Sequence, residues 1–99
     1  MNYTKGEWKL RETLRDHNDD IFWHTSVVCG GKRVARSTGI GEDEAFANAQ
    51  LISAAPDLYE ALKEARKELK AWVKDHGECI ATNDVINSIN KAIAKAEGK

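Results

Sequence analysis

The chain has 99 residues, 41% of them hydrophobic and 31% charged, and one proline. This length predicts a single domain with a modest core. No apolar run approaches the roughly 20 residues of a membrane span, and the charged N-terminus lacks a signal-peptide core, so we expect no membrane association. The net charge of −1 argues against a globally basic nucleic-acid-binding protein.

Three strands are predicted in the first 41 residues. Residues 8–14 alternate, which places Trp8, Leu10 and Leu14 on one face and Lys9, Arg11 and Thr13 on the other. Residues 16–20 are polar and predict a turn. Residues 21–29 are rich in β-branched and aromatic side chains, and Gly30 and Gly31 then supply a tight hairpin turn. Residues 32–37 form a short third strand, and residues 38–41 interrupt the pattern.

A helix is predicted from Glu42, because three acids in a first turn complement the helix dipole. Its apolar positions are Ala45, Phe46, Ala49 and Ile52. Pro56 should kink or restart this helix. Beyond it runs a stripe of apolar residues at helical spacing, with Tyr59 and Val73 on its flank: Leu58, Leu62, Ala65, Leu69 and Trp72.

Gly77 is expected to end this long helix, and Thr82 or Asn83 to cap a last one. The apolar side of the last helix is Val85, Ile86, Ile89, Ala92, Ile93 and Ala96. The predicted class is therefore α+β in the order β-β-β-α-α, as one domain over residues 1–99. A β-meander occupies residues 1–41 and a helical part residues 42–99.

Charge is divided between these two parts. Seven basic and five acidic residues give residues 1–41 a charge of +2, and eight basic and eleven acidic residues give residues 42–99 a charge of −3. The three tryptophans and the long apolar stripe together present more hydrophobic surface than a core of this size can bury. We therefore expect a homo-oligomer.

The sheet carries the first candidate site. Arg11, Arg33 and Arg36 beside an indole suit a ligand with phosphates and a flat base, because guanidinium groups fork onto phosphate oxygens and rings stack. The candidate ligand-binding residues of the sheet are Trp8, Arg11, Trp23, Arg33 and Arg36. In the alternative interpretation, the basic residues protect an edge strand from aggregation and the tryptophans belong to the core.

The last helix carries the second candidate. Asn83, Asn87 and Asn90 follow i, i+4, i+7 spacing and share one helix face. Asparagine is a poor helix former, so these amides are candidates for an oligomer interface or a polar ligand, with Asn83 and Asn87 as the ligand-binding pair. A plain solvated face is the alternative.

Catalytic and metal-binding motifs are missing from the sequence. His17, His24 and His76 show no metal-ligand spacing, and Cys29 and Cys79 form no CxxC pair. The two cysteines are best interpreted as free thiols in a reducing cytoplasm. We expect neither an enzyme nor a cofactor.

Three segments carry a resemblance to known proteins. The opening KGEWKL, the strand ending GGKRVARSTG and the helix NAQLISAAPDLYEALKEA resemble a large, functionally mixed set of small accessory proteins from tailed phages and prophages. The resemblance covers most of residues 4–66. Within that set, the meander followed by two helices is similar in layout to the phage anti-Thoeris sponge proteins, which oligomerise and sequester a cyclic ADP-ribose signal without degrading it.

A second resemblance is to the arm-type DNA-binding domains of phage integrases, which share a G-x-W strand, a basic hairpin turn and a helix after three strands. Their sheets carry denser Lys and Arg than the +2 found here, and DNA affinity depends on neutralising phosphates. The leading hypothesis is thus a non-enzymatic anti-defence protein that sequesters a nucleotide-derived signal in the bacterial cytoplasm. A protein–protein inhibitor of a defence complex such as CRISPR comes second, and sheet-based DNA binding third.

Overall fold

The computed structural model describes residues 2–15 and 21–99, and it divides into two units, residues 1–55 and 56–99. The expected polar turn at residues 16–20 lies outside the described residues. The elements are β1 (Lys9–Arg15), β2 (Phe22–Cys29), β3 (Lys32–Ile40), α1 (Glu42–His76) and α2 (Ile80–Ala96). This confirms the predicted β-β-β-α-α order. None of the helices in the described part of the chain could span a membrane.

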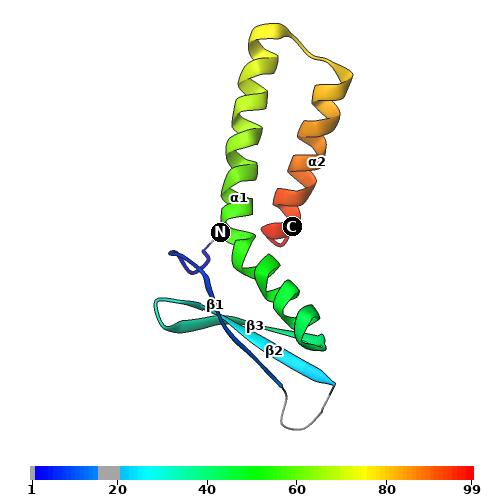
Figure 1. Cartoon of the computed structure of the whole chain (residues 1–99). Coiled ribbons are helices and arrows are strands. Elements are labelled where there is room, and N and C mark those ends of the chain that lie inside the picture. The colour runs from blue at the N-terminus through cyan, green and yellow to red at the C-terminus, as the bar shows by residue number, and fades with distance from the viewer. Residues whose placement is uncertain (1, 16–20) are drawn as a thin grey trace. The chain divides into compact units, whose positions relative to one another are not determined.

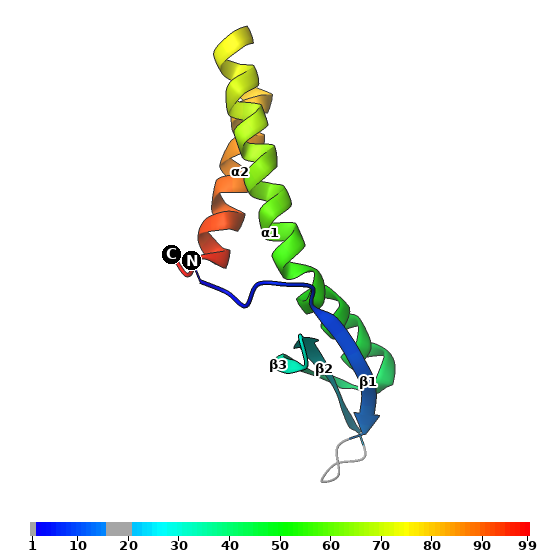
Figure 2. The same cartoon turned by 90° about the vertical axis from the view of Figure 1, so that its left-hand side faces the viewer.

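The first unit is a three-stranded antiparallel sheet in the order β1-β2-β3, and the first turns of α1 lie along one face (Figures 1 and 2). Thr25 and Val27 of β2 and Ala45 and Ala49 of α1 are completely buried between sheet and helix. The Ser37 hydroxyl donates a hydrogen bond of 2.9 Å to the carbonyl oxygen of Ala45. Residues paired with Thr25 and Val27 therefore face α1, and their sequence neighbours face away from it.

The alternation predicted for the whole of the first strand is wrong, because β1 contains a β-bulge. Leu10 pairs with Val27 but Thr13 pairs with Thr25, so β1 carries one residue more than β2 in this stretch. The extra residue reverses the faces beyond it. Thr13 turns toward α1, where its hydroxyl lies 2.8 Å from that of Thr25. Leu14, predicted on the buried side, is 46% exposed on the other face.

The third strand is longer than predicted, and the break expected at residues 38–41 is confined to Gly41, between β3 and α1. β3 continues through Gly39 to Ile40, because Gly39 lets the backbone of α1 approach the sheet closely. A Cβ atom at Gly39 would lie 2.5 Å from the backbone nitrogen of Ala45. The turn at Gly30 and Gly31 is as expected, with φ of 58° and 83°.

Helix α1 begins at Glu42, as predicted, and continues through Pro56 without the expected restart. Because proline has no N–H, the carbonyl of Ile52 loses its helical hydrogen bond at that point. Phe46, predicted on the buried side, is 42% exposed, since the two alanines at 45 and 49 are the residues that contact the sheet.

The second unit is a helical hairpin of the later turns of α1 and of α2 (Figure 1). Its buried apolar residues are Tyr59, Ile89 and Ile93. The predicted α1 stripe is rotated: Leu58 and Trp72 are 51% and 44% exposed, and Tyr59 on its flank is the buried residue. The physical reason is that Tyr59 donates a 2.7 Å hydrogen bond to Glu97, which turns this side of α1 toward α2.

Helix α2 begins at Ile80, and its N-cap is Cys79 with extended backbone, three residues before Thr82 and four before Asn83, the predicted caps. Its thiol makes no close capping hydrogen bond, yet the amide groups of Thr82 and then Ala81 lower the pKa of the Cys79 thiol because they favour the thiolate. Of the predicted apolar side of α2, Ile89 and Ile93 are buried, whereas Val85, Ala92 and Ala96 are exposed.

Candidate functional site

The face of the sheet turned away from α1 is the candidate site. Its side chains follow from the pairing around β2, whose outward residues are Phe22, His24, Ser26 and Val28. Across the central strand, Val28 is flanked by Lys9 and Arg33, and Ser26 pairs with Arg36. Directly paired residues share a face. We call Lys9, Arg33 and Arg36 the basic end of this open face.

The basic end brings three cations within reach of one anionic group. Lys9 and Arg33 lie two strand spacings apart, about 10 Å, and Arg36 lies about 7 Å from Arg33 along β3. The backbones are thus separated by distances that long side chains can bridge. All three residues are exposed, and Arg33 and Arg36 offer planar forks that match phosphate oxygens.

His24 holds one of these arginines on the open face. The Arg36 Nη2 atom lies 3.1 Å from His24 Nδ1. A guanidinium group can only donate, so in this contact Arg36 is the donor and His24 Nδ1 the acceptor. His24 itself is half-buried in the central strand.

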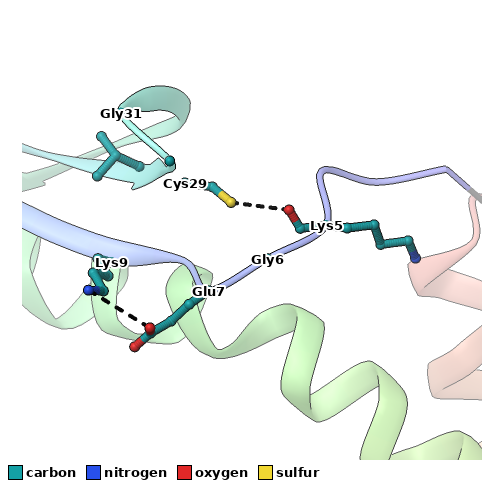
Figure 3. Close-up of a pocket in the computed structure, with 8 residues that line it drawn as sticks. Lys5, Gly6, Glu7, Lys9, Cys29 and Gly31 are labelled. Carbon is teal, nitrogen blue, oxygen red and sulfur yellow. Dashed lines mark hydrogen bonds and ion pairs between the residues drawn. The ribbon is translucent and has the colours of Figure 1, made fainter.

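An open hollow of about 510 Å³ adjoins the basic end (Figure 3). Its walls are the segment from Lys5 to Glu7, the start of β1 and the β2–β3 turn. The Cys29 thiol donates a 3.3 Å hydrogen bond to the carbonyl oxygen of Lys5, and Lys9 forms a 3.8 Å ion pair with Glu7. The ammonium group of Lys5 points away from Cys29 (Figure 3). It lies 3.5 Å from the centre of the Tyr3 ring.

Glycine is needed at one wall of this hollow. Gly6 has a φ of 122°, and a Cβ atom there would lie 2.8 Å from the sulfur of Cys29. The Lys9–Glu7 pair is exposed on both sides, so it holds Lys9 only weakly and leaves its ammonium group able to turn to a ligand. The hollow has the size of a small-molecule site.

A second hollow, of about 390 Å³, has the opposite character. Its lining includes three carboxylates, those of Glu12, Glu42 and Asp43, together with Thr13 and Phe46. Carboxylates repel phosphate, so of these two hollows only the one beside the basic end suits an anionic ligand.

The other end of the open face is apolar. Leu14 pairs with His24, and Phe22 pairs with Ile40. These three apolar side chains are 46%, 36% and 62% exposed for Leu14, Phe22 and Ile40. We call them the apolar end. The open face therefore joins cations at one end to an exposed aromatic ring at the other, about 13 Å away along β2 between the Ser26 and Phe22 positions.

The structure brings together two of the sheet residues proposed from the sequence, Arg33 and Arg36. Arg11 lies in the bulge of β1. Trp23 pairs with Gly39 and so faces α1, half-buried. Trp8 precedes β1, where its indole N–H donates a 2.9 Å hydrogen bond to the carbonyl of Thr4. The two tryptophans lie near opposite ends of the sheet.

The asparagines of the last helix belong to the other unit. Asn87 is exposed and Asn83 is half-buried. Asn90 is half-buried, and its side-chain oxygen accepts a 3.3 Å hydrogen bond from Arg66 of α1, so it serves the hairpin itself. His24 was missing from the candidates proposed from the sequence, whereas Lys9 was expected on the same strand face as Arg11. The signal that identifies His24 is the strand pairing across β2, which spacing along a single strand does not reveal.

Comparison with known protein families gives a match that covers the whole chain. The family model described as Salmonella phage P22 protein Y8K6 matches residues 1–99. No curated protein and no solved structure matches the chain. The expected likeness to small phage proteins is thus confirmed at the level of a phage family, and this chain belongs to the family of Salmonella phage P22 protein Y8K6.

Proposed function

We propose that this member of a phage protein family is a non-catalytic binding protein that sequesters a nucleotide-derived signal of host defence, of the cyclic ADP-ribose type. The observation that carries the proposal is the basic end of the open face, where Lys9, Arg33 and Arg36 surround Val28 and Ser26 beside a hollow of about 510 Å³. The likeness in layout to phage sponge proteins gives the class of ligand.

The ligand's phosphates would lie at the basic end. Arg33 and Arg36 donate paired N–H groups to phosphate oxygens, and Lys9 adds a compact positive charge from β1. The Arg36–His24 contact keeps one guanidinium in place before the ligand arrives, which reduces the entropy lost on binding.

The ligand's base would lie toward the apolar end. The imidazole of His24 and the ring of Phe22 are two residues apart on the open face, and both can contact a flat base. Trp23 cannot take this role on the same face, because it faces α1 opposite Gly39. Retention without turnover fits a sequence that carries none of the common catalytic motifs.

The test is binding of cyclic ADP-ribose isomers and a panel of cyclic nucleotides, measured by thermal shift and calorimetry. We expect one of them to raise the melting temperature and to be recovered unchanged, by mass spectrometry, after the protein is denatured. Arg33→Ala with Arg36→Ala should lower the affinity at least tenfold. The control is Arg15→Ala, an exposed arginine that pairs with Trp23 and so belongs to the other face.

Two results would count against this function: no shift with any compound in the panel, or equal affinity of the double variant and the wild type. Duplex DNA forms a second arm of the same experiment. Retardation that disappears between low and moderate salt would instead assign the basic end to DNA phosphates.

The apolar end supports a second candidate, a protein–protein inhibitor of a defence complex. Phe22 and Ile40 form an exposed apolar pair of the kind that partner proteins cover. Capture of a defence complex from host lysate that is lost in Phe22→Glu and retained in the double arginine variant would favour this function over nucleotide sequestration.

A further inference from the structure

The helical hairpin shows which residues of α1 and α2 face each other. Tyr59 donates to Glu97, and Arg66 donates to Asn90, at 2.7 and 3.3 Å. As the α1 residue advances by seven, its partner in α2 retreats by seven, so the two helices run antiparallel. Ile93, between these two partners, is 2% exposed.

A second apolar stripe lies beside the facing positions: its members come one residue before Tyr59, Arg66, Ile93 or Glu97, or seven residues from such a member, whereas Ile89, before Asn90, is buried. In α1 it comprises Leu58, Ala65 and Trp72, and in α2 it comprises Val85, Ala92 and Ala96. We call these six residues the outer stripe. Leu58, Trp72 and Val85 are 51%, 44% and 49% exposed. The ring of Trp72 stacks on His76 at 4.6 Å and still leaves this area uncovered.

Both halves of the outer stripe lie on one side of the hairpin. A step of one residue rotates a side chain by about 100° around a helix. Antiparallel helices turn in opposite senses when viewed along one axis. A step back from the facing position therefore moves both helices' side chains toward the same side, and the hairpin presents one continuous apolar face.

Charges of opposite sign border this face. On α1 the edge away from α2 carries Glu64 and Glu68, and on α2 the edge away from α1 carries Lys91 and Lys95. All four are exposed, and among the described residues none of them forms an ion pair. The acidic and basic edges lie on opposite sides of the same face, too far apart to neutralise each other.

We propose that a second copy of this chain covers the outer stripe, so that two hairpins form an antiparallel four-helix bundle in which α1 of each copy lies against α2 of the other. Two-fold symmetry allows two face-to-face antiparallel arrangements. One places α1 against α1 and brings Glu64 and Glu68 of one copy against Glu64 and Glu68 of the other, where like charges repel. The other places α1 against α2 and brings those acids against Lys91 and Lys95, which the charges favour.

The 4-3 spacing of the α1 stripe fits this occupant. Leu58, Leu62, Ala65, Leu69 and Trp72 follow the seam spacing of helical bundles. A second hairpin of the same sequence has the same spacing, so knobs from one copy meet holes in the other. This inference concerns the second unit alone and does not depend on the function proposed for the sheet.

The first test is the mass of the full chain in solution by analytical ultracentrifugation. We expect twice the 11.0 kDa of one chain. Trp72→Glu should weaken association at least tenfold. The matched control is Ile80→Glu, because Ile80 is 83% exposed yet lies off the outer stripe, so this variant should remain a dimer. Circular dichroism checks that both variants keep their helices.

The second test separates the two arrangements. Glu64→Lys with Glu68→Lys, and Lys91→Glu with Lys95→Glu, should each weaken self-association, since each places like charges along the α1–α2 seam. In the α1–α1 arrangement the same reversals leave like charges facing like charges, as in the wild type, so self-association would not weaken further. Mixed together, the two double variants should form a mixed dimer in either arrangement, which checks that both remain able to pair.

A wild-type chain that stays monomeric at tens of micromolar, or a Trp72→Glu variant that dimerises like the wild type, would overturn the proposed dimer. A wild type that dimerises, together with double variants that each self-associate as strongly as the wild type, would overturn the α1–α2 arrangement.

Discussion

Substitution of Gly39 by alanine should lower the free energy of unfolding of the first unit much more than a glycine-to-alanine substitution at an open position. The added methyl group would lie 2.5 Å from the nitrogen of Ala45 and 2.8 Å from the carbonyl carbon of Glu44. Carbon and nitrogen atoms normally stay about 3.5 Å apart, so α1 would have to move by about 1 Å. Both clashing atoms are backbone and cannot rotate away. We expect a loss of about 3 kcal/mol, at the upper end for overpacked sites.

The control for this prediction is Gly30→Ala. A Cβ atom there meets nothing within 4 Å, and the cost arises only from a φ of 58°, about 1 kcal/mol. Urea unfolding should be followed by tryptophan fluorescence in a Trp72→Phe background, so that Trp8 and Trp23 report on the first unit. Total stabilities of small proteins are about 5–15 kcal/mol, which makes a difference of 2 kcal/mol measurable. Equal unfolding midpoints for the two variants would refute the close approach of α1 to β3.

Three further predictions concern the second unit and the thiols. Ile93→Ala should lower the free energy of unfolding by about 3 kcal/mol in urea, because Ile93 is 2% exposed. The Tyr59 hydroxyl, followed by Lys99, lowers the pKa of Glu97; Tyr59→Phe should therefore destabilise the protein at pH 7, and the difference should shrink as the pH falls through the pKa of Glu97. Iodoacetamide should modify Cys79 faster than Cys29 at pH 7.5, because neighbouring amides favour the Cys79 thiolate.

Each of these has a clear contrary outcome. An Ile93→Ala variant no weaker than Ile80→Ala would contradict the assigned core of the hairpin, since Ile80 is 83% exposed. A Tyr59→Phe effect that grows toward acid pH would reverse the sign expected from a lowered carboxyl pKa. Equal alkylation rates for the two cysteines, measured by peptide mass spectrometry, would show that the start of α2 does not activate the thiol.

The element order could be predicted because the spacing of apolar residues and the residues that typically begin or end elements indicate the same boundaries along the chain. Alternation, the two glycines after Cys29 and the acids at Glu42 each give a local signal, and the structure confirms β2, the turn and the beginning of α1. The β-bulge of β1 could not be predicted in this way. Nothing between Leu10 and Thr13 departs from a regular strand, and the extra residue becomes visible only against the register of β2.

The candidate site shows the same limit. Arg33 and Arg36 were found as cations near a turn, and the sequence alone could not tell which face of the sheet α1 covers. That choice depends on Thr25, Val27 and Ala45, which are buried together, and it places Trp23 with them. On α1, Leu58 and Tyr59 are equally apolar by pattern, and the hydrogen bond from Tyr59 to Glu97, 38 residues away, decides which of them faces α2.

The β-bulge of β1 has a counterpart in β3, and together they affect how the edges of the sheet can pair. In a three-stranded sheet both outer strands are edges, and here each edge strand carries an extra residue, between Leu10 and Thr13 in β1 and at Val34 in β3. A bulge breaks the regular row of free N–H and C=O groups that another strand would need for pairing. The two edges of the sheet are therefore poor templates for pairing with a strand of another molecule.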